Sequence, residues 1–164
     1  MKKITLMVTM IVVNFILQTS LFGFFGFLSV IPNLSLIILV IFSMASDGLT
    51  GGILGFITGL LYDAMIYDVF GIYTLIYFLI GATIGTFSDD MVGENYFAYS
   101  LVTGISTAVM HFLLYIILFF LRYRVKMAVI NFSAIFLEIV INTVLVVFVL
   151  KFIVFIFNKL NIKA

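Results

Sequence analysis

The chain has 164 residues, of which 65% are hydrophobic and 9% are charged, and its formal net charge is +1. Its mean hydropathy of +1.40 lies far above the range of soluble domains and predicts an integral membrane protein. Membrane spans of about 20 residues each take up nearly the whole chain, which leaves no room for a soluble catalytic or nucleic-acid-binding domain. The chain contains no cysteine, which excludes disulfides, thiolate metal ligands and cysteine nucleophiles.

The hydropathy pattern predicts a single transmembrane domain over residues 1–164, with six apolar segments and no soluble domain. Backbone amide and carbonyl groups inside a bilayer must be hydrogen-bonded within the chain, so we expect an all-α bundle of six transmembrane helices. An apolar run after Lys151 suggests that the last helix continues to near Lys159. The expected spans cover residues 4–22, 34–46, 50–66, 71–87, 96–121 and 128–150.

The first segment follows Lys2 and Lys3 and is similar to a signal sequence. Its apolar run is longer than a typical signal core, and no small-x-small cleavage pattern follows it. We therefore expect an uncleaved span whose N-terminus lies on the cytoplasmic side. After it, Pro32 and Asn33 predict a turn or the start of the next helix, because proline fixes φ and restricts the residue before it.

Glycine recurs at every fourth position of the third segment, and Asp63 follows at the next step. On a helix this spacing leaves one face almost without side chains, which is typical of close helix packing in a bilayer. A second glycine pair occurs in the fourth segment, so the two faces either pack on each other or receive a helix from a partner or a second copy. The predicted packing or partner interface consists of Gly51, Gly55, Gly59, Asp63, Gly71, Gly81 and Gly85.

Asp63 is unusual because a carboxylate cannot face lipid at low cost. Two interpretations are open. The side chain caps the following turn or reaches the headgroups, or it is a buried acceptor that fixes the register of two helices. Removing one side of a buried polar pair costs roughly 1–3 kcal/mol, so the second interpretation would make Asp63 structurally important.

Two ionisable residues, His111 and Glu138, are expected at similar depth in the membrane. They lie 13 residues before and 14 residues after Arg124, and antiparallel helices rise about 1.5 Å per residue. We hypothesise that they contact each other; alternatively, each binds a backbone carbonyl, a hydroxyl or water. Such residues normally point into the bundle. The predicted buried polar cluster consists of Asn14, Gln18, His111, Glu138 and Asn142.

The connection between the fifth and sixth segments is basic and contains Arg122, Arg124 and Lys126. We expect these side chains to anchor the helix ends at the headgroups, or else to meet acidic residues of a partner. With six spans and a cytoplasmic N-terminus this loop faces outside, against the positive-inside rule. If the second and third segments together crossed the membrane only once, or if one of them were re-entrant, the loop would be cytoplasmic and the C-terminus would lie outside. Charge alone leaves both topologies open.

The middle of the chain carries a specific pattern: Pro32-Asn33-Leu34, Gly55-Phe56-x-x-Gly59-Leu60-x-x-Asp63, Gly71-x-x-x-Leu75 and Gly81-x-x-x-Gly85. This pattern resembles the MreD family, the small membrane subunit of the bacterial rod-shape system (elongasome). The length, lysine-rich start and span count are also similar, so the resemblance covers essentially the whole chain. Asn33 is a departure, because an aspartate is expected after the proline in many relatives.

Membership of that family would imply six helices folded like the substrate-binding S component of energy-coupling-factor vitamin transporters. It would also imply contacts with MreC, and through MreC with MreB and the peptidoglycan glycosyltransferase and transpeptidase. The expected function is a non-enzymatic scaffold that maintains rod shape in the bacterial cell membrane, with a homodimer as an open possibility. The alternative is a solute-binding subunit of a vitamin uptake transporter, which would need a pocket lined by the polar cluster.

Catalysis is not expected from this sequence. A metalloprotease helix needs His-Glu-x-x-His, and the chain has one histidine. No Gly-x-Ser-x-Gly pattern places a serine nucleophile beside a base. We therefore expect no catalytic residue, no metal, no cofactor and no nucleic-acid partner.

Overall fold

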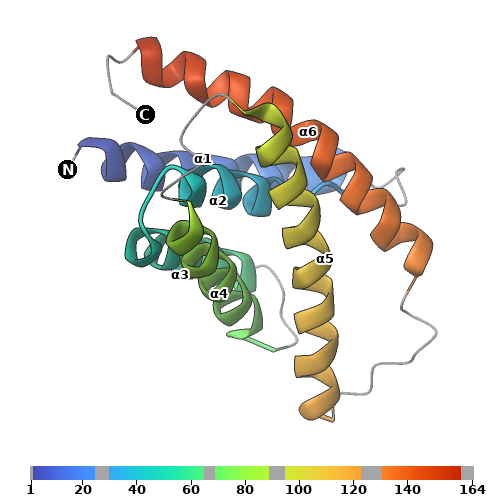
Figure 1. Ribbon diagram of the computed structural model, residues 1–164. Helices are drawn as coiled ribbons and strands as arrows, with labels where there is room; N and C mark the ends of the chain where they lie inside the picture. Colours follow the sequence, from blue (N-terminus) through green and yellow to red (C-terminus); the bar gives the residue numbers. More distant parts are fainter. Residues whose placement is uncertain (1, 25–29, 65–68, 89–94, 123–130, 160–164) are drawn as a thin grey trace.

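The computed structural model consists of helices (Figure 1). It describes residues 2–24, 30–64, 69–88, 95–122 and 131–159. The predicted all-α class is confirmed, and α5 and α6 are each long and apolar enough to cross a membrane. The helices are α1 (Lys2–Phe24), α2 (Leu34–Met44), α3 (Gly48–Asp63), α4 (Ile72–Phe87), α5 (Tyr96–Phe120) and α6 (Phe132–Lys159).

Helix α6 begins at Phe132 and continues as one helix of 28 residues to Lys159. It thus extends beyond the expected span, which ended at residue 150, and ends where the apolar run after Lys151 suggested. Lysine is a good helix former, so Lys151 does not end the helix. Its ammonium lies 5.6 Å from the centroid of the Tyr96 ring at the start of α5. Residues 128–130 of the expected span lie outside the described residues.

Helix α2 lies inside the bundle and contacts each of the other five described helices. Nine of its 11 residues are buried, because apolar side chains occur on all of its faces. A helix of this length extends about 16 Å, which is short of the roughly 30 Å thickness of a bilayer's hydrocarbon core. By itself, α2 therefore does not cover the thickness of the membrane.

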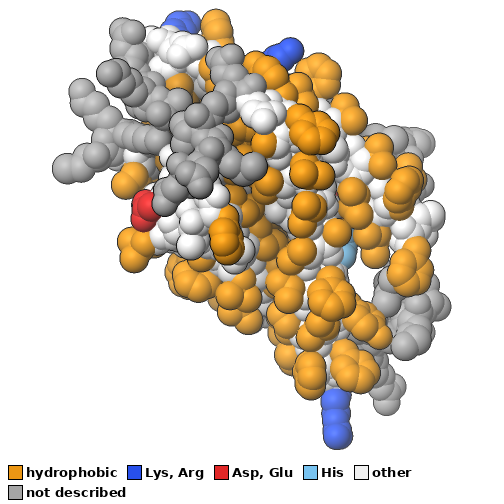
Figure 2. Space-filling model, viewed as in Figure 1, with side chains coloured by type: hydrophobic (Ala, Val, Ile, Leu, Met, Phe, Trp, Pro, Cys, Tyr) orange, Lys and Arg blue, Asp and Glu red, His pale blue; other side chains and the backbone are white. Residues whose placement is uncertain are grey.

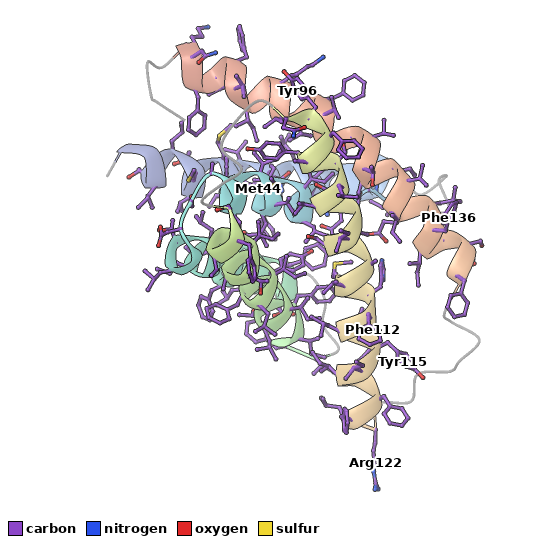
Figure 3. All side chains as sticks on the ribbon, in the orientation of Figure 1. Met44, Tyr96, Phe112, Tyr115, Arg122 and Phe136 are labelled. Atoms are coloured by element: carbon purple, nitrogen blue, oxygen red, sulfur yellow. The ribbon has the colours of Figure 1, made fainter. Side chains whose placement is uncertain are left out.

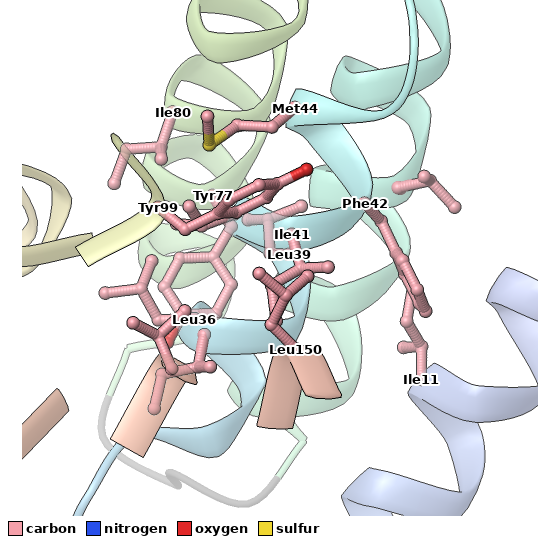
Figure 4. Packing of buried hydrophobic residues seen from close by; sticks show 14 of the residues in the cluster. Ile11, Leu36, Leu39, Ile41, Phe42, Met44, Tyr77, Ile80, Tyr99 and Leu150 are labelled. Carbon is pink, nitrogen blue, oxygen red and sulfur yellow. The ribbon is translucent and has the colours of Figure 1, made fainter. Parts of the chain in front are cut away.

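The core is assembled around α2 from large apolar side chains (Figure 4). Phe42 of α2 faces Ile11 of α1, and its ring centroid lies 6.5 Å from that of Phe157 in α6. Tyr77 of α4 is fully buried beside Leu36. Since α1, α4 and α6 all meet α2 through such side chains, this short helix holds the bundle together.

Helices α3 and α4 form an antiparallel hairpin whose far end is closed by capping residues. Asp47 caps α3 by accepting the backbone N–H of Thr50 at 3.3 Å. Hydrogen bonding from the side chain and then the backbone of Thr50 holds the pKa of this exposed carboxyl below its ordinary value. Ser88, after α4, donates its hydroxyl to the carbonyl oxygen of Ser46 at 2.9 Å. The bond between Ser88 and Ser46 fixes the turn before α3 to the end of α4.

Hydrophobic side chains cover most of the face seen in Figure 2, and Lys and Arg side chains appear there only at its upper and lower ends. Along α5, Tyr96 lies at one end, and Arg122 at the other end extends away from the bundle (Figure 3). Phe112, Phe136 and Phe148 are more than half exposed. An apolar band between charged ends is the surface expected of a protein surrounded by lipid.

Candidate functional site

The glycine face of α3 lies directly against the backbone of α4, and we call this pair the glycine hairpin. A Cβ added to Gly51 would overlap the carbonyl oxygen of Gly81, and one added to Gly81 would overlap that of Gly51. A Cβ on Gly55 would overlap the carbonyl oxygen of Tyr77. Backbone atoms cannot rotate away as side-chain ends do, so residues larger than glycine would force the two helices apart.

The same close approach continues at both ends of the glycine hairpin. A Cβ on Gly59 would overlap the Cα of Thr74, and a Cβ on Gly85 would lie 2.6 Å from the carbonyl oxygen of Asp47. The two glycine faces are therefore used against each other within the chain. A partner helix would have to approach other surfaces.

Gly71 contributes to the hairpin in a different way, because no atom lies within 4 Å of the position of its missing Cβ. It precedes α4 with φ of 101°, in the left-handed region that residues with a side chain rarely adopt. Gly71 is thus required for the backbone conformation that starts α4 and not for packing.

Asp63 is 1% exposed and caps the start of α4 from the end of α3. Its two carboxylate oxygens accept the backbone N–H groups of Tyr73 at 3.0 Å and Thr74 at 2.8 Å. The hydroxyl of Thr74 adds a third bond at 2.6 Å. The N-terminus of a helix carries unpaired N–H groups and a partial positive charge, so this position stabilises a buried carboxylate.

Asn33 occupies a junction of four helices at the start of α2. Its side-chain oxygen accepts the N–H of Leu36 at 3.0 Å, and its amide donates to the hydroxyl of Tyr77 at 2.8 Å. The backbone N–H of Asn33 donates to Oδ1 of Asn142 at 3.0 Å. Asn142 in turn donates to the hydroxyl of Thr107 at 3.2 Å. We call these residues, with those of α1 below, the α2 junction.

Helix α1 completes the α2 junction through Gln18 and Asn14. The side-chain oxygen of Gln18 accepts both the N–H and the hydroxyl of Ser35, at 3.1 Å and 2.6 Å. Asn14 donates to the same hydroxyl at 3.1 Å. Three N–H groups at the start of α2, those of Asn33, Ser35 and Leu36, are therefore paired by side chains, as a buried helix start requires.

His111 and Glu138 lie in contact, with 2.9 Å between Nε2 of His111 and Oε2 of Glu138. Their side chains are 22% and 15% exposed, so both are only partly buried. Each lies one helical turn from a residue of the α2 junction. Glu138 precedes Asn142 on α6, and His111 follows Thr107 on α5. The five polar residues of the expected cluster thus form two groups: Asn14, Gln18 and Asn142 at the α2 junction, and His111 with Glu138 beside it.

Several residues at these sites are not indicated by the sequence analysis. Ser35 and Thr107 take part in the α2 junction, and Thr74 binds Asp63. Threonine and serine in apolar helices commonly bond their own backbone, as Thr107 does with the carbonyl oxygen of Thr103 at 2.9 Å. Their sequence positions therefore carry little signal for a contact between helices.

Three tyrosines, which we call the tyrosine cluster, are also absent from the sequence-based sites. The ring centroids of Tyr62 and Tyr73 lie 4.7 Å apart, and those of Tyr62 and Tyr77 lie 5.6 Å apart. Tyr73 and Tyr77 meet edge to face at 6.0 Å. The cluster lies where the end of α3 meets the start of α4.

Of the three expected headgroup anchors, Arg122 is exposed at the end of α5 and has φ of 50°. Arg124 and Lys126 lie outside the described residues. Among the described residues, no group of three His, Cys, Asp or Glu side chains is arranged to hold a metal ion. The polar chemistry described here consists of helix caps, amide contacts and one His–Glu pair.

Comparison with known proteins places the chain in a family. No curated protein and no solved structure matches it. The family model described as rod shape-determining protein MreD matches residues 1–156, which is nearly the whole sequence. The chain therefore belongs to the MreD family of rod shape-determining membrane proteins.

Proposed function

We propose that this chain is a non-enzymatic scaffold subunit that maintains rod shape by helix–helix contacts with MreC. MreD proteins have a role in rod shape determination and are membrane proteins. The proposal extends this role to a specific partner, and through MreC to MreB and the peptidoglycan glycosyltransferase and transpeptidase.

The observation that carries the proposal is the α2 junction. Side chains of α1 and α6 accept backbone N–H groups at the start of α2. Side chains of α4 and α5 accept the side-chain amides of Asn33 and Asn142 at the same junction. The glycine hairpin adds a second rigid unit, because its backbones are in contact. A scaffold must keep its outer helix faces in fixed positions relative to one another. Buried hydrogen bonds and close backbone packing favour such a rigid shape.

The partner contact is proposed for the outer helix faces, because the glycine faces of α3 and α4 pack against each other. Helices in lipid associate through close packing and interhelical hydrogen bonds, so shape complementarity supplies the specificity. The proposed topology has six membrane segments and a cytoplasmic N-terminus, although α2 by itself is shorter than the hydrocarbon core. We also propose that the six helices follow the same order in space as those of the S component of energy-coupling-factor transporters.

The test is co-purification of the tagged chain from its own membranes in detergent, together with the shape of cells depleted of it. Recovery of MreC and rounding of depleted cells would support the scaffold. Rod-shaped cells after depletion, or recovery of paired ATPases and a coupling subunit in place of MreC, would overturn it. The second result would favour the alternative of solute uptake.

A further inference from the structure

We propose that this chain has an intramembrane binding site for an organic cation, a primary ammonium or guanidinium group, formed by Tyr62, Tyr73, His111 and Glu138. We call these residues the cation site. The proposal goes beyond the scaffold role and does not rest on it, because the site lies within one chain. Neither the caps nor the α2 junction uses these four side chains.

The first observation is that Glu138 has unused acceptor capacity. Oε2 lies 2.9 Å from Nε2 of His111, whereas Oε1 has no hydrogen bond with any described residue. The side chain is 15% exposed, so Glu138 is not fully enclosed by the bundle. The oxygens of a carboxylate inside a membrane normally accept hydrogen bonds from the protein or from water, because lipid tails offer no donors.

Asp63 provides an internal comparison for Glu138. Both carboxylates belong to apolar helices, but Asp63 accepts three hydrogen bonds and is 1% exposed. Among the described residues His111 is the one ionisable partner of Glu138, and no described lysine or arginine contacts the Glu138 carboxylate. The carboxylate is left open to a donor that the described chain does not supply.

The second observation is the tyrosine cluster. The hydroxyl of Tyr77 is bonded to Asn33, but the hydroxyls of Tyr62 and Tyr73 have no hydrogen bond with a described residue. The rings of Tyr62 and Tyr73 are 4.7 Å apart between centroids and pack against each other. Aromatic surfaces attract ammonium and guanidinium groups through the negative charge density of the ring faces.

The carboxylate and the tyrosine cluster belong to one region. Tyr77 of the cluster accepts a hydrogen bond from Asn33, Asn33 donates to Asn142, and Asn142 lies one turn from Glu138 on α6. An electrostatic contribution of Glu138 at Tyr62 and Tyr73 agrees with this placement. A cation bound in this region would meet a carboxylate and aromatic rings.

Depth limits how a ligand reaches the cation site. His111 precedes Arg122 by 11 positions, or about 16 Å of helix, and Arg122 is exposed at the end of α5. A cation at this depth arrives either on a side chain of a partner's membrane helix or as a small amine. The recognition chemistry is the same for both sources: a positive donor for Glu138 and two phenolic oxygens, stabilised by ring faces.

The test uses the purified full-length chain in detergent with n-hexylammonium as the probe and n-hexanol as the neutral control. Unfolding can be followed by tyrosine fluorescence, because the chain has eight tyrosines and no tryptophan. We expect hexylammonium to raise the melting midpoint in a saturable way and hexanol not to. Equal effects of the two compounds, or no effect of either, would overturn the proposal.

Variants assign the binding to these residues. Glu138→Gln removes the charged acceptor, so we expect it to raise the hexylammonium concentration at half-saturation by about tenfold. Tyr62→Phe and Tyr73→Phe each keep the ring and remove one phenolic oxygen, and we expect each to raise that concentration several-fold. Asp47→Asn removes an exposed carboxylate elsewhere and is the matched control. If Glu138→Gln does not fold, the two tyrosine variants carry the test; wild-type binding in both would overturn the proposal.

The source of the cation is distinguished by repeating the titration on the chain purified together with its partners. A probe that still binds supports a small amine as the ligand. A probe that binds only the isolated chain supports a partner's side chain already in the cation site. Failure of the scaffold proposal is visible separately, as absence of MreC from the purified complex, and does not affect binding to the isolated chain.

Discussion

Asp63, the last residue of α3, accepts the backbone N–H of Thr74 in the first turn of α4 at 2.8 Å. Helix caps usually come from the residue just before the helix, but here that residue is Gly71, which has no side chain. The cap is therefore supplied across the hairpin. The arrangement fixes the register of two helices and places a buried carboxylate where the helix dipole favours it.

We predict that Asp63→Ala lowers the free energy of unfolding by about 1–3 kcal/mol, because two buried N–H groups lose their acceptors. Asp63→Asn keeps one carbonyl oxygen and should fall between Ala and the wild type. The melting midpoint of the purified chain in detergent measures both. Asp47→Ala, at an exposed cap, is the comparison, and an equal loss there would contradict the trans-hairpin role of Asp63.

Close packing in the glycine hairpin predicts a difference between neighbouring glycines. Gly55→Ala should be strongly destabilising, because its Cβ would overlap the backbone of Tyr77. Gly52→Ala should be much milder, since its Cβ would lie 3.1 Å from the movable ring end of Phe78. Melting midpoints of the two variants provide the measurement. Similar midpoints would show that the backbone contact does not control stability.

The same packing predicts an effect on assembly. Gly55→Leu and Gly59→Leu should reduce recovery of partner proteins, because separated helices change the shape of the outer faces. Membrane insertion should persist, since leucine favours the bilayer. Membrane fractionation and detergent co-purification test the two statements. Normal recovery of partners with both variants would refute this prediction.

Gly71 offers a test of backbone conformation without packing. Gly71→Ala should cost about 1–2 kcal/mol, because a Cβ disfavours the left-handed region even where space is open. Gly71→Asn should recover part of this loss, since asparagine adopts that region more readily. The melting midpoints of the wild type, Gly71→Asn and Gly71→Ala should decrease in that order. Alanine equal to glycine would rule out a φ requirement.

Asn33 caps α2, and either an amide or a carboxylate can do so. Asn33→Asp should therefore have a small effect: its carboxylate still accepts from Leu36, and the Tyr77 hydroxyl becomes the donor. Asn33→Ala should cost about 1–3 kcal/mol, since it leaves buried polar groups unpaired. Comparison of unfolding midpoints tests the contrast. A large loss with aspartate would show that the amide donor is essential.

The helical class follows from the sequence because lipid, as the solvent, requires apolar segments with internally bonded backbones. Depth counting on an antiparallel pair brought His111 level with Glu138, and the structure has them in contact. The sequence also pointed to Asp63, although it left the role of this carboxylate open between a cap and a buried acceptor. In the structure the side chain is both.

Other features depend on the assembled bundle and leave little trace in sequence. Hydropathy identifies the segment of α2 but does not reveal that five helices surround it. Ser35 and Thr107 are short side chains that usually bond their own helix, so their contacts with Gln18 and Asn142 arise only from tertiary placement. The tyrosine cluster likewise forms where two helix ends meet.

The contact of Asn33 with Asn142 has a consequence for biosynthesis, because the two residues are 109 positions apart in the chain. Helix α2 leaves the ribosome early, yet the acceptor for its first N–H emerges only with α6. Until then the start of α2 lacks one of its partners. A nascent chain interrupted before α6 thus has an incomplete α2 junction, and the bundle can finish folding only after α6 has been synthesised.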